Sequence, residues 1–320
     1  MKKKVLPLMI AAIMAIGGLS ITASAANTGT STVDITKTLT ATGLEDTVFN
    51  VTVEEKGYSD VSASVTSQPE IGDFSITVEK GETTGTYTIQ LPEYESVGIY
   101  NYEIKETTGN VAGVTYSTAT LWLVVTVTND GNGGFARSAV VYLGSTSGDK
   151  NTQEFKNYYD SGTLNVSKSV TGNLGDKTKE FNVTVTFTKG NDVTINSTIS
   201  YTDGTTTYYI EPSDWNGNTA TATITVKDGS SVAFKNIPYG ITYTVEEDDY
   251  TTVDGYTTTY DASNTGTLNS SEVTVAITNY KNNSAATGVI LDSLPYILIL
   301  AVVLIGVVYL VLRRRTSDRY

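Results

Sequence analysis

From residue 27 to residue 285, hydrophobic side chains recur at every second position over short stretches rich in threonine, valine, tyrosine and isoleucine. Alternation with a period of two is typical of β-strands with one face in a core, and no segment here shows a convincing helical period. Clusters of glycine, asparagine and aspartate separate the stretches and indicate turns. Many short strands at this spacing predict an all-β fold of antiparallel β-sandwiches. The clearest predicted strands span residues 33–40, 48–53, 86–91, 100–106, 121–128, 139–143, 164–170, 181–187, 221–226, 243–247 and 273–278.

The first 25 residues follow a different pattern, with three lysines at positions 2–4, an apolar run at 5–21 and a small-x-small site at 23–25. This order predicts a secretory signal peptide, residues 1–25, cut near Ala25 or Ala26. The alternative is a retained N-terminal membrane helix. It is less favoured because the apolar run is short and interrupted by glycine.

A second apolar run spans residues 294–312, and Arg313, Arg314 and Arg315 follow it directly. We predict a transmembrane helix whose basic tail stays in the cytoplasm, so that the region between the two ends lies outside the cell. A simple single-pass anchor would be sufficient to explain this run.

The segment before this run, Ser284-Ala285-Ala286-Thr287-Gly288, adds a further prediction. A Thr-Gly pair, a membrane span and a basic tail, in this order, resemble the cell-wall sorting signals that sortase cuts between threonine and glycine. The cut would fall between Thr287 and Gly288, and residues 283–320 would form the sorting signal. Ser284 and Ala285 replace the usual Leu-Pro, which leaves open the class of sortase that recognises the signal.

Charge and composition narrow the possible functions. Residues 26–287 carry 14 lysines and arginines against 32 aspartates and glutamates, a difference of −18, which argues against nucleic acid or anionic lipid as partners. The chain has no histidine and no cysteine, which excludes a Ser-His-Asp triad, a thiol nucleophile, a usual zinc site and disulfides. The run at 129–134 resembles part of a calcium loop, but a later acidic ligand is missing, so we interpret it as a hairpin loop. We predict no metal site and no cofactor.

The exported region, about 260 residues long, suits two domains, which we place at residues 27–159 and 160–282. Each half begins with a strand that holds a lysine in an apolar register. Each half contains a later strand of the form Tyr-x-hydrophobic-x-Glu, and each ends with a hydrophobic residue followed, two positions later, by asparagine.

Strand parity directs these polar residues inward, because alternate side chains of a strand share a face. In the first half, Lys37 shares a face with Val33 and Ile35, Glu106 shares one with Ile104, and Asn157 follows Phe155. Parity therefore selects these residues over their charged neighbours. The matching residues of the second half are Lys168, Glu247 and Asn279.

Buried lysine, glutamate and asparagine side chains need partners, since burial without them costs several kcal/mol. A buried ion pair with an asparagine hydrogen bond is one interpretation. The other is an isopeptide bond between lysine and asparagine, with the glutamate as the catalytic group. Desolvation lowers the pKa of a lysine and raises that of a glutamic acid, so a neutral amine could attack the carboxamide while a protonated carboxyl polarises its oxygen. The recurrence of the same three residue types, in the same order, favours the second interpretation.

These residues resemble the Gram-positive pilin isopeptide-linkage family, which includes backbone pilins of the streptococcal T-antigen type. The resemblance covers nearly the whole chain, and it is stronger in the second half than in the first. It implies two tandem immunoglobulin-like (Cna-B-like) sandwiches, each with an isopeptide bond. The segments that carry it are Phe155-Lys156-Asn157, Leu164-Asn165-Val166-Ser167-Lys168, Lys179-Glu180-Phe181-Asn182, Val245-Glu246-Glu247-Asp248-Asp249-Tyr250, Ile277-Thr278-Asn279 and Thr287-Gly288-Val289.

The resemblance also implies covalent assembly at the surface of a Gram-positive cell. In that family a sortase joins the C-terminal threonine of one subunit to a surface lysine of the next, and the shaft is finally attached to peptidoglycan or a base pilin. The matching loop here precedes the closing strand of the first domain, which makes Lys150 the candidate acceptor. An ordinary solvated lysine is an equally good interpretation of Lys150.

Three functions remain open at this stage. The first is a structural shaft subunit, which is not an enzyme apart from its single-turnover cross-linking. The second is an ancillary pilin or wall-anchored adhesin that binds a host or glycan ligand. The third is a carboxylate-based glycosidase, which is disfavoured because no further paired acids stand out.

Overall fold

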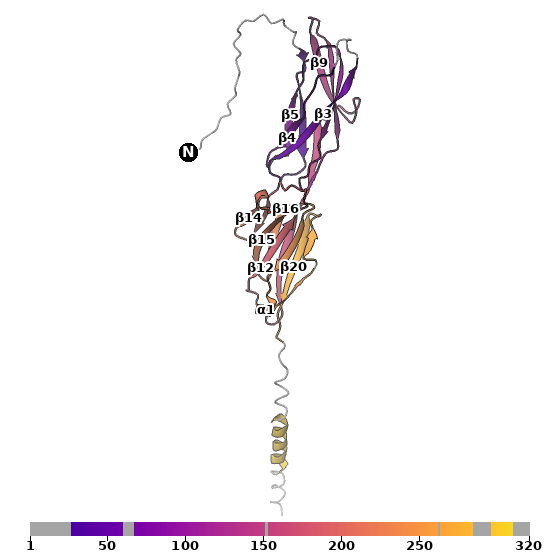
Figure 1. Ribbon diagram of the computed structural model, residues 1–320. Coiled ribbons are helices and arrows are strands. Elements are labelled where there is room, and N and C mark those ends of the chain that lie inside the picture. Colours follow the sequence, from indigo (N-terminus) through magenta and orange to yellow (C-terminus); the bar gives the residue numbers. More distant parts are fainter. Residues whose placement is uncertain (1–26, 60–66, 151–152, 262, 284–295, 310–320) are drawn as a thin grey trace, which may run out of the picture. The chain divides into compact units, whose positions relative to one another are not determined.

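The computed structural model describes residues 27–59, 67–150, 153–261, 263–283 and 296–309 (Figure 1). These residues are mostly β-strands, and they divide into two compact units. The first unit ends at Tyr159 and the second begins at Asp160, while Val111–Gly113 group with the second unit. We call the two units the first and the second domain and describe each by itself.

The first domain consists of two sheets with its core between them. Along its strands buried and exposed side chains alternate, as the period-two pattern predicts. The six-stranded sheet has the order β1 (Thr28–Gly29), β9 (Phe135–Leu143), β8 (Thr120–Asn129), β6 (Gly98–Glu106), β3 (Thr47–Ser59) and β4 (Phe74–Val78). The four-stranded sheet has the order β5 (Thr84–Gln90), β2 (Thr32–Leu39), β10 (Glu154–Tyr159) and β7 (Val114–Thr115).

The second domain repeats this plan, and a separate hydrophobic cluster fills the space between its sheets. Two short helices, η1 (Pro212–Asp214) and α1 (Thr251–Asp254), lie in its connections. Its six-stranded sheet has the order β14 (Thr207–Ile210), β13 (Ile199–Thr202), β16 (Ser231–Pro238), β11 (Ser161–Thr171), β20 (Glu272–Tyr280) and β18 (Thr257–Tyr260). Its four-stranded sheet has the order β15 (Thr219–Val226), β12 (Phe181–Thr188), β17 (Thr242–Glu247) and β19 (Thr265–Thr267).

The prediction of purely antiparallel sandwiches is wrong in one respect. Strand β2 pairs with β10 in parallel, and β11 pairs with β20 in parallel. A hairpin forces consecutive strands to run in opposite directions, but these partners are the early and the closing strands of each domain, so no hairpin joins them. The lysine strand and the asparagine strand therefore lie side by side and run in the same direction.

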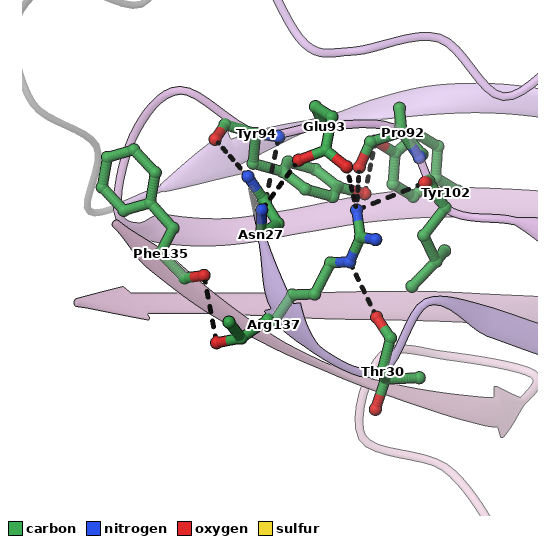
Figure 2. Close-up of polar contacts among 10 residues, drawn as sticks. Asn27, Thr30, Pro92, Glu93, Tyr94, Tyr102, Phe135 and Arg137 are labelled. Atoms are coloured by element: carbon green, nitrogen blue, oxygen red, sulfur yellow. Dashed lines mark hydrogen bonds and ion pairs between the residues drawn. The ribbon is translucent and has the colours of Figure 1, made fainter. Parts of the chain in front are cut away.

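The first described residues are held firmly to the first domain (Figure 2). Arg137 of β9, whose side chain is only 6% exposed, donates from Nε to the carbonyl oxygen of Thr30 at 2.8 Å and from Nη1 to that of Pro92 at 2.6 Å. The side chain of Asn27 donates to the carbonyl oxygen of Tyr94 at 3.2 Å and accepts from its backbone N–H at 3.1 Å. These contacts fix Asn27 and Thr30 to the rest of the first domain.

The predicted signal peptide and sorting motif lie outside the described residues. Residues 296–309 are helical, and the rest of the predicted span 294–312 lies outside the described residues. Within the described ranges, no helix has both the length and the hydrophobicity needed to cross a membrane.

Candidate functional site: a buried Lys–Glu–Asn cluster in each domain

Lys37 and Asn157 occupy neighbouring parallel strands in the first domain. In the register of β2 and β10, Lys37 lies opposite Phe155, and Leu39 lies opposite Asn157. The asparagine is therefore two residues further along the partner strand and on the same face of the sheet. Both Lys37 and Asn157 are completely buried, with an exposed fraction of 0%.

Glu106 meets this pair from the opposite sheet, where it ends β6. Its Oε2 accepts a hydrogen bond from Lys37 Nζ at 2.6 Å, and its Oε1 accepts one from Asn157 Nδ2 at 2.7 Å. The backbone N–H of Ser117 donates to Asn157 Oδ1 at 2.7 Å. One carboxyl group thus joins the amine to the carboxamide across the core, and the carboxamide oxygen has a separate donor.

Burial makes Lys37 a weak base. Desolvation lowers the pKa of its amine to about 8, although the hydrogen bond and the charge of Glu106 act in the opposite direction. The amine also lies 4.4 Å from the centre of the Phe49 ring. A lysine with this pKa is neutral in a far larger fraction of molecules near neutral pH than an exposed lysine is.

The second domain repeats the geometry with Lys168, Glu247 and Asn279. Lys168 of β11 lies opposite Ile277 of β20, and Val170 lies opposite Asn279, so the offset of two residues is the same. Lys168 Nζ forms a hydrogen-bonded ion pair with Glu247 Oε1, and both side chains are fully buried at 0% exposure. Desolvation also lowers the pKa of Lys168.

The carboxamides of the two clusters differ in their partners. In the second domain, Glu247 Oε2 accepts a hydrogen bond from Thr258 Oγ1 at 2.9 Å, whereas in the first domain the matching carboxyl oxygen binds the asparagine. Both Nδ2 and Oδ1 of Asn279 are buried and have no hydrogen-bond partner among the residues that the structure describes. Each buried polar atom without a partner costs about 1–3 kcal/mol.

The charged neighbours of the selected residues, which strand parity predicted to face outward, lie outside the clusters. Glu103 makes ion pairs with Lys56 at 3.0 Å and Lys105 at 2.9 Å on the outer side of its sheet. Glu246 and Lys156 are exposed. The structure therefore brings together the three selected residues of the first domain, pairs Lys168 with Glu247 in the second with Asn279 buried on the adjacent strand, and leaves these neighbours outside.

One shared feature of the clusters escaped the sequence prediction. Lys168 Nζ lies 4.2 Å from the centre of the Phe181 ring, as Lys37 does beside Phe49. Both phenylalanines begin the same pentapeptide, Phe-Asn-Val-Thr-Val, at residues 49–53 and 181–185. A search for short exact repeats would have found this aromatic wall of the site.

The structure describes one of the three remaining predicted site residues. Lys150 is exposed, and its Nζ lies 5.5 Å from the centre of the Tyr142 ring. Thr287 and Gly288 lie outside the described residues. The proposed acceptor is thus accessible, while the proposed cleavage site has no structural description.

Known proteins share both the sequence pattern and the fold. Residues 33–160 match the Spy0128-like isopeptide containing domain, and residues 162–281 match a domain of unknown function, DUF7601. A pilin of Streptococcus pyogenes serotype M1 is 30% identical over 234 residues, which cover 66% of this chain and 65% of that pilin. The chain is thus similar in sequence to a streptococcal pilin, and its first domain to an isopeptide containing domain.

Solved structures of pilins have the same architecture. The major pilin of Streptococcus pyogenes is 24% identical, with a TM-score of 0.54 over 80% of this chain and 100% of that one. The major pilin T3.2 of serotype GAS13637 is 21% identical, with a TM-score of 0.54 over 79% of this chain and 99% of that one. At this level of identity the two structures establish a shared fold. The serotype M1 pilin extends beyond its match, since the match spans only 65% of its length.

Proposed function

We propose that this chain is a structural shaft subunit of a cell-surface pilus. Each of its two immunoglobulin-like sandwiches would be closed by an autocatalytic isopeptide bond, Lys37–Asn157 in the first domain and Lys168–Asn279 in the second. The observation that carries the proposal is the repeated arrangement, in which a buried lysine pairs with a glutamate and a buried asparagine lies two residues further along on the adjacent parallel strand.

In the first domain, the reaction begins when Lys37 passes a proton from Nζ to Oε2 of Glu106, 2.6 Å away. The neutral amine forms a new bond to Cγ of Asn157, and the N–H of Ser117 stabilises the negative charge that develops on Oδ1. Glu106 returns its proton through Oε1 to Nδ2 as the old C–N bond breaks and ammonia leaves. The attacking nitrogen gives its surplus proton to the carboxylate, so Glu106 ends protonated and the new amide keeps one hydrogen.

In these steps, the group that stabilises the oxyanion is not the one that the amino-acid sequence suggested. Parity suggested that the glutamic acid polarises the carboxamide oxygen. In the first domain Glu106 faces the leaving nitrogen instead, and a backbone N–H faces the oxygen. Folding holds the reacting groups together, and effective molarities of about 10⁵ M or more can make the amide exchange feasible.

The position of the bonds suits a load-bearing shaft. Each bond would connect an early strand of its domain to the adjacent closing strand, β2 to β10 and β11 to β20. A force that pulls the two ends of a domain apart would then pass through a covalent link instead of the hydrogen bonds of the sheets. The residues between the linked strands would stay folded under that force.

Assembly would follow from the predicted ends of the chain. The signal peptide at residues 1–25 would direct export, and the membrane span at 294–312 would hold the subunit until a sortase cuts between Thr287 and Gly288. The Thr287 carboxyl would then be joined to Lys150 of the next identical subunit, and the last subunit to peptidoglycan or a base pilin. The exposure of Lys150 supports its role as the acceptor.

Intact-mass measurement of the exported protein tests the cross-links. The expected mass is lower than the sequence mass by two molecules of ammonia, and tryptic peptides should include both lysine–asparagine pairs. Asn157→Ala and Asn279→Ala should each restore the mass of one ammonia, after correction for the substitution. A mass equal to that of the sequence would exclude both bonds.

Blotting of cell-wall extracts tests the pilus assignment. We expect a ladder of high-mass polymers that disappears in Lys150→Arg, because arginine keeps the charge but is not acylated. Lys156→Arg is the matched control, since Lys156 is also exposed and lies six residues away. A ladder that persists in Lys150→Arg moves the acceptor to another lysine, and the absence of any ladder in the unaltered chain refutes the assignment.

A further inference from the structure

The outer face of the six-stranded sheet of the first domain carries a block of large apolar side chains. Trp122 lies directly opposite Tyr142, and Val124 lies directly opposite Val140, so two strands contribute a two-by-two arrangement. All four side chains are partly exposed and point away from the core. The residues that alternate with them, Leu121, Leu123, Val125 and Val141, are completely buried on the other face.

This block departs from the pattern of a solvated sheet. A strand with one face in water alternates apolar and polar residues, whereas a strand covered on both faces has a continuous apolar run. Residues 121–125 (Leu-Trp-Leu-Val-Val) and 139–143 (Ala-Val-Val-Tyr-Leu) are such runs. Their sequence is therefore that of strands covered on both sides.

The second domain provides an internal control. On the outer face of its four-stranded sheet, Thr184 lies opposite Thr223, and Thr186 lies between Thr221 and Thr244. Every one of these positions is threonine, which suits a face that stays in water. The apolar block is thus particular to β8 and β9, because the outer face of a sheet in the second domain lacks such a block at the positions compared.

We propose that the block formed by Trp122, Val124, Val140 and Tyr142 docks a second copy of this chain, at the end of that copy's second domain. The inference rests on the proposed function, because its position follows from Lys150. Lys150 Nζ lies 5.5 Å from the centre of the Tyr142 ring, at the margin of the block. A subunit joined to Lys150 would meet this surface first.

The end of the second domain from which the chain leaves has matching apolar side chains. Leu174 is 48% exposed, Val253 is 83% exposed and Tyr280 is 47% exposed. Their three segments lie close together, since the backbone N–H of Leu174 donates to the carbonyl oxygen of Lys281, next to Tyr280, at 3.1 Å. Gly255, the residue after α1, lies near the side chain of the same lysine.

The length of chain that would connect the two surfaces is short. Thr287 follows Tyr280 by seven residues, which span at most about 25 Å when fully extended. A bond between Thr287 and Lys150 would therefore keep the exposed apolar side chains of one copy close to the apolar block of the next. Such a head-to-tail contact does not close on itself, and its repetition produces a filament.

Photo-cross-linking of the full chain on its own cells tests the docking. A benzophenone amino acid in place of Tyr142 should give cross-links to residues 171–176, 250–256 or 280–283 of a second copy, identified by mass spectrometry. The same group in place of Tyr209, which is 59% exposed in the second domain, is the control and should give at least fivefold fewer such products.

The outcomes separate this inference from the proposed function. Polymers with the expected cross-links support both. Polymers whose position 142 reacts with another protein, with another part of the chain or with nothing overturn the docking and leave the pilus assignment intact. Cross-links between copies without polymers support the docking and refute the pilus, and the absence of both overturns both.

A conservative double variant gives a second measure. Val124→Thr with Val140→Thr keeps the shape and the β-propensity of the sheet and copies the threonine face of the second domain. We expect an unchanged loss of two ammonia molecules from the sequence mass and at least a fivefold loss of the longest polymers. Thr184→Val with Thr223→Val, at directly paired positions of the second domain, should leave the ladder unchanged. Equal ladders in all three proteins would overturn the docking.

Discussion

The two domains place the same three residue types in the same register but surround the carboxamide differently. In the first domain Asn157 has a partner for each amide atom, Glu106 for Nδ2 and the N–H of Ser117 for Oδ1. In the described part of the second domain neither amide atom of Asn279 has a partner, although both are buried. The sheet pairing therefore determines which residues meet, whereas the neighbouring segments determine how well the carboxamide is prepared for attack.

This difference should affect the rate of bond formation in the first domain and the stability gained from the bond in the second. Before the bond forms, the first domain already holds a donor at the oxygen that becomes negative, which favours a fast reaction. The second domain carries unpartnered amide atoms, and loss of Nδ2 as ammonia would remove one of them. We expect bond formation to be faster in the first domain and to stabilise the second domain more.

The largest expected effect comes from removal of the catalytic acid in one domain at a time. Glu106→Gln or Glu247→Gln should prevent the bond in its own domain, because an amide cannot take up and return the proton. Each bond closes a loop of more than 100 residues, so its loss should lower the free energy of unfolding by about 5 kcal/mol. Calorimetry should show one transition moving and the other unchanged.

The comparison predicts unequal losses in these two variants. Glu247→Gln should cost about 1 kcal/mol more than Glu106→Gln, since Asn279 would keep its unpartnered nitrogen. Mass spectrometry must show loss of one ammonia instead of two in each variant. Equal transitions in both variants and the unaltered protein would contradict a stabilising role for the bonds.

A smaller effect is expected from the oxyanion donor of the first domain. Ser117→Pro removes the N–H that bonds to Asn157 Oδ1, and loss of one such donor slows comparable reactions about 10²–10³-fold. Ser117→Ala keeps the N–H and is the matched control. To measure the rate, the chain is made in a cell-free system, held in urea and then diluted into buffer. The loss of ammonia is followed with time after the dilution.

The second domain serves as an internal reference in that experiment. Its bond should form at the same rate in Ser117→Pro and in Ser117→Ala. Resistance of the first domain to protease distinguishes slow chemistry from failed folding. A first-domain bond that forms at full speed in Ser117→Pro would mean that another group stabilises the oxyanion.

Much of the fold could be predicted from alternation alone, and each of the eleven predicted strands is present, although β3 continues six residues past its predicted end. Strand β16 was missed for a physical reason. Asn236 has a φ of 61°, and it shifts the buried positions from Phe234 to Ile237, which breaks the period of two. The four-residue strands β13 and β14 are too short to show a period. Alternation also could not predict whether paired strands run parallel or antiparallel, because it assigns a face to each residue but does not show which strands pair.

The candidate site was predictable to the extent that it depends on strand faces. Lys37, Glu106 and Asn157 could be selected because a single step along a strand moves a side chain from the core to the solvent. The N–H of Ser117 could not, since a backbone group leaves no trace in the sequence. Thr258 was equally hidden, because threonine is common on the strands of this chain and only the fold singles one out.

The smallest expected effect is that of pH on the reaction, and its direction follows from the shared proton. In the folded first domain before cross-linking, burial holds the pKa of Lys37 near 8, below its usual 10.5. Between these values the unfolded chain binds a proton that the folded chain lacks, so stability before cross-linking should rise with pH in that window. A neutral amine beside a protonated carboxyl holds the same number of protons as a charged amine beside a carboxylate. The proportion of the neutral pair is therefore independent of pH until the pair loses a proton.

We therefore expect the rate of bond formation in the first domain to be level just below about pH 8 and to fall about tenfold per pH unit above it. The dilution assay over a series of buffers measures this profile, with ammonia loss assigned to each domain by peptide mapping. Lys168 also has a lowered pKa because of burial, so the second domain should show a profile of the same shape. A rate that instead rises to about pH 8 and then stays level would mean that the neutral amine alone is limiting. The proton on the glutamic acid would then have no part in the slow step, and the contact between Glu106 Oε1 and Asn157 Nδ2 would serve only to position the carboxamide.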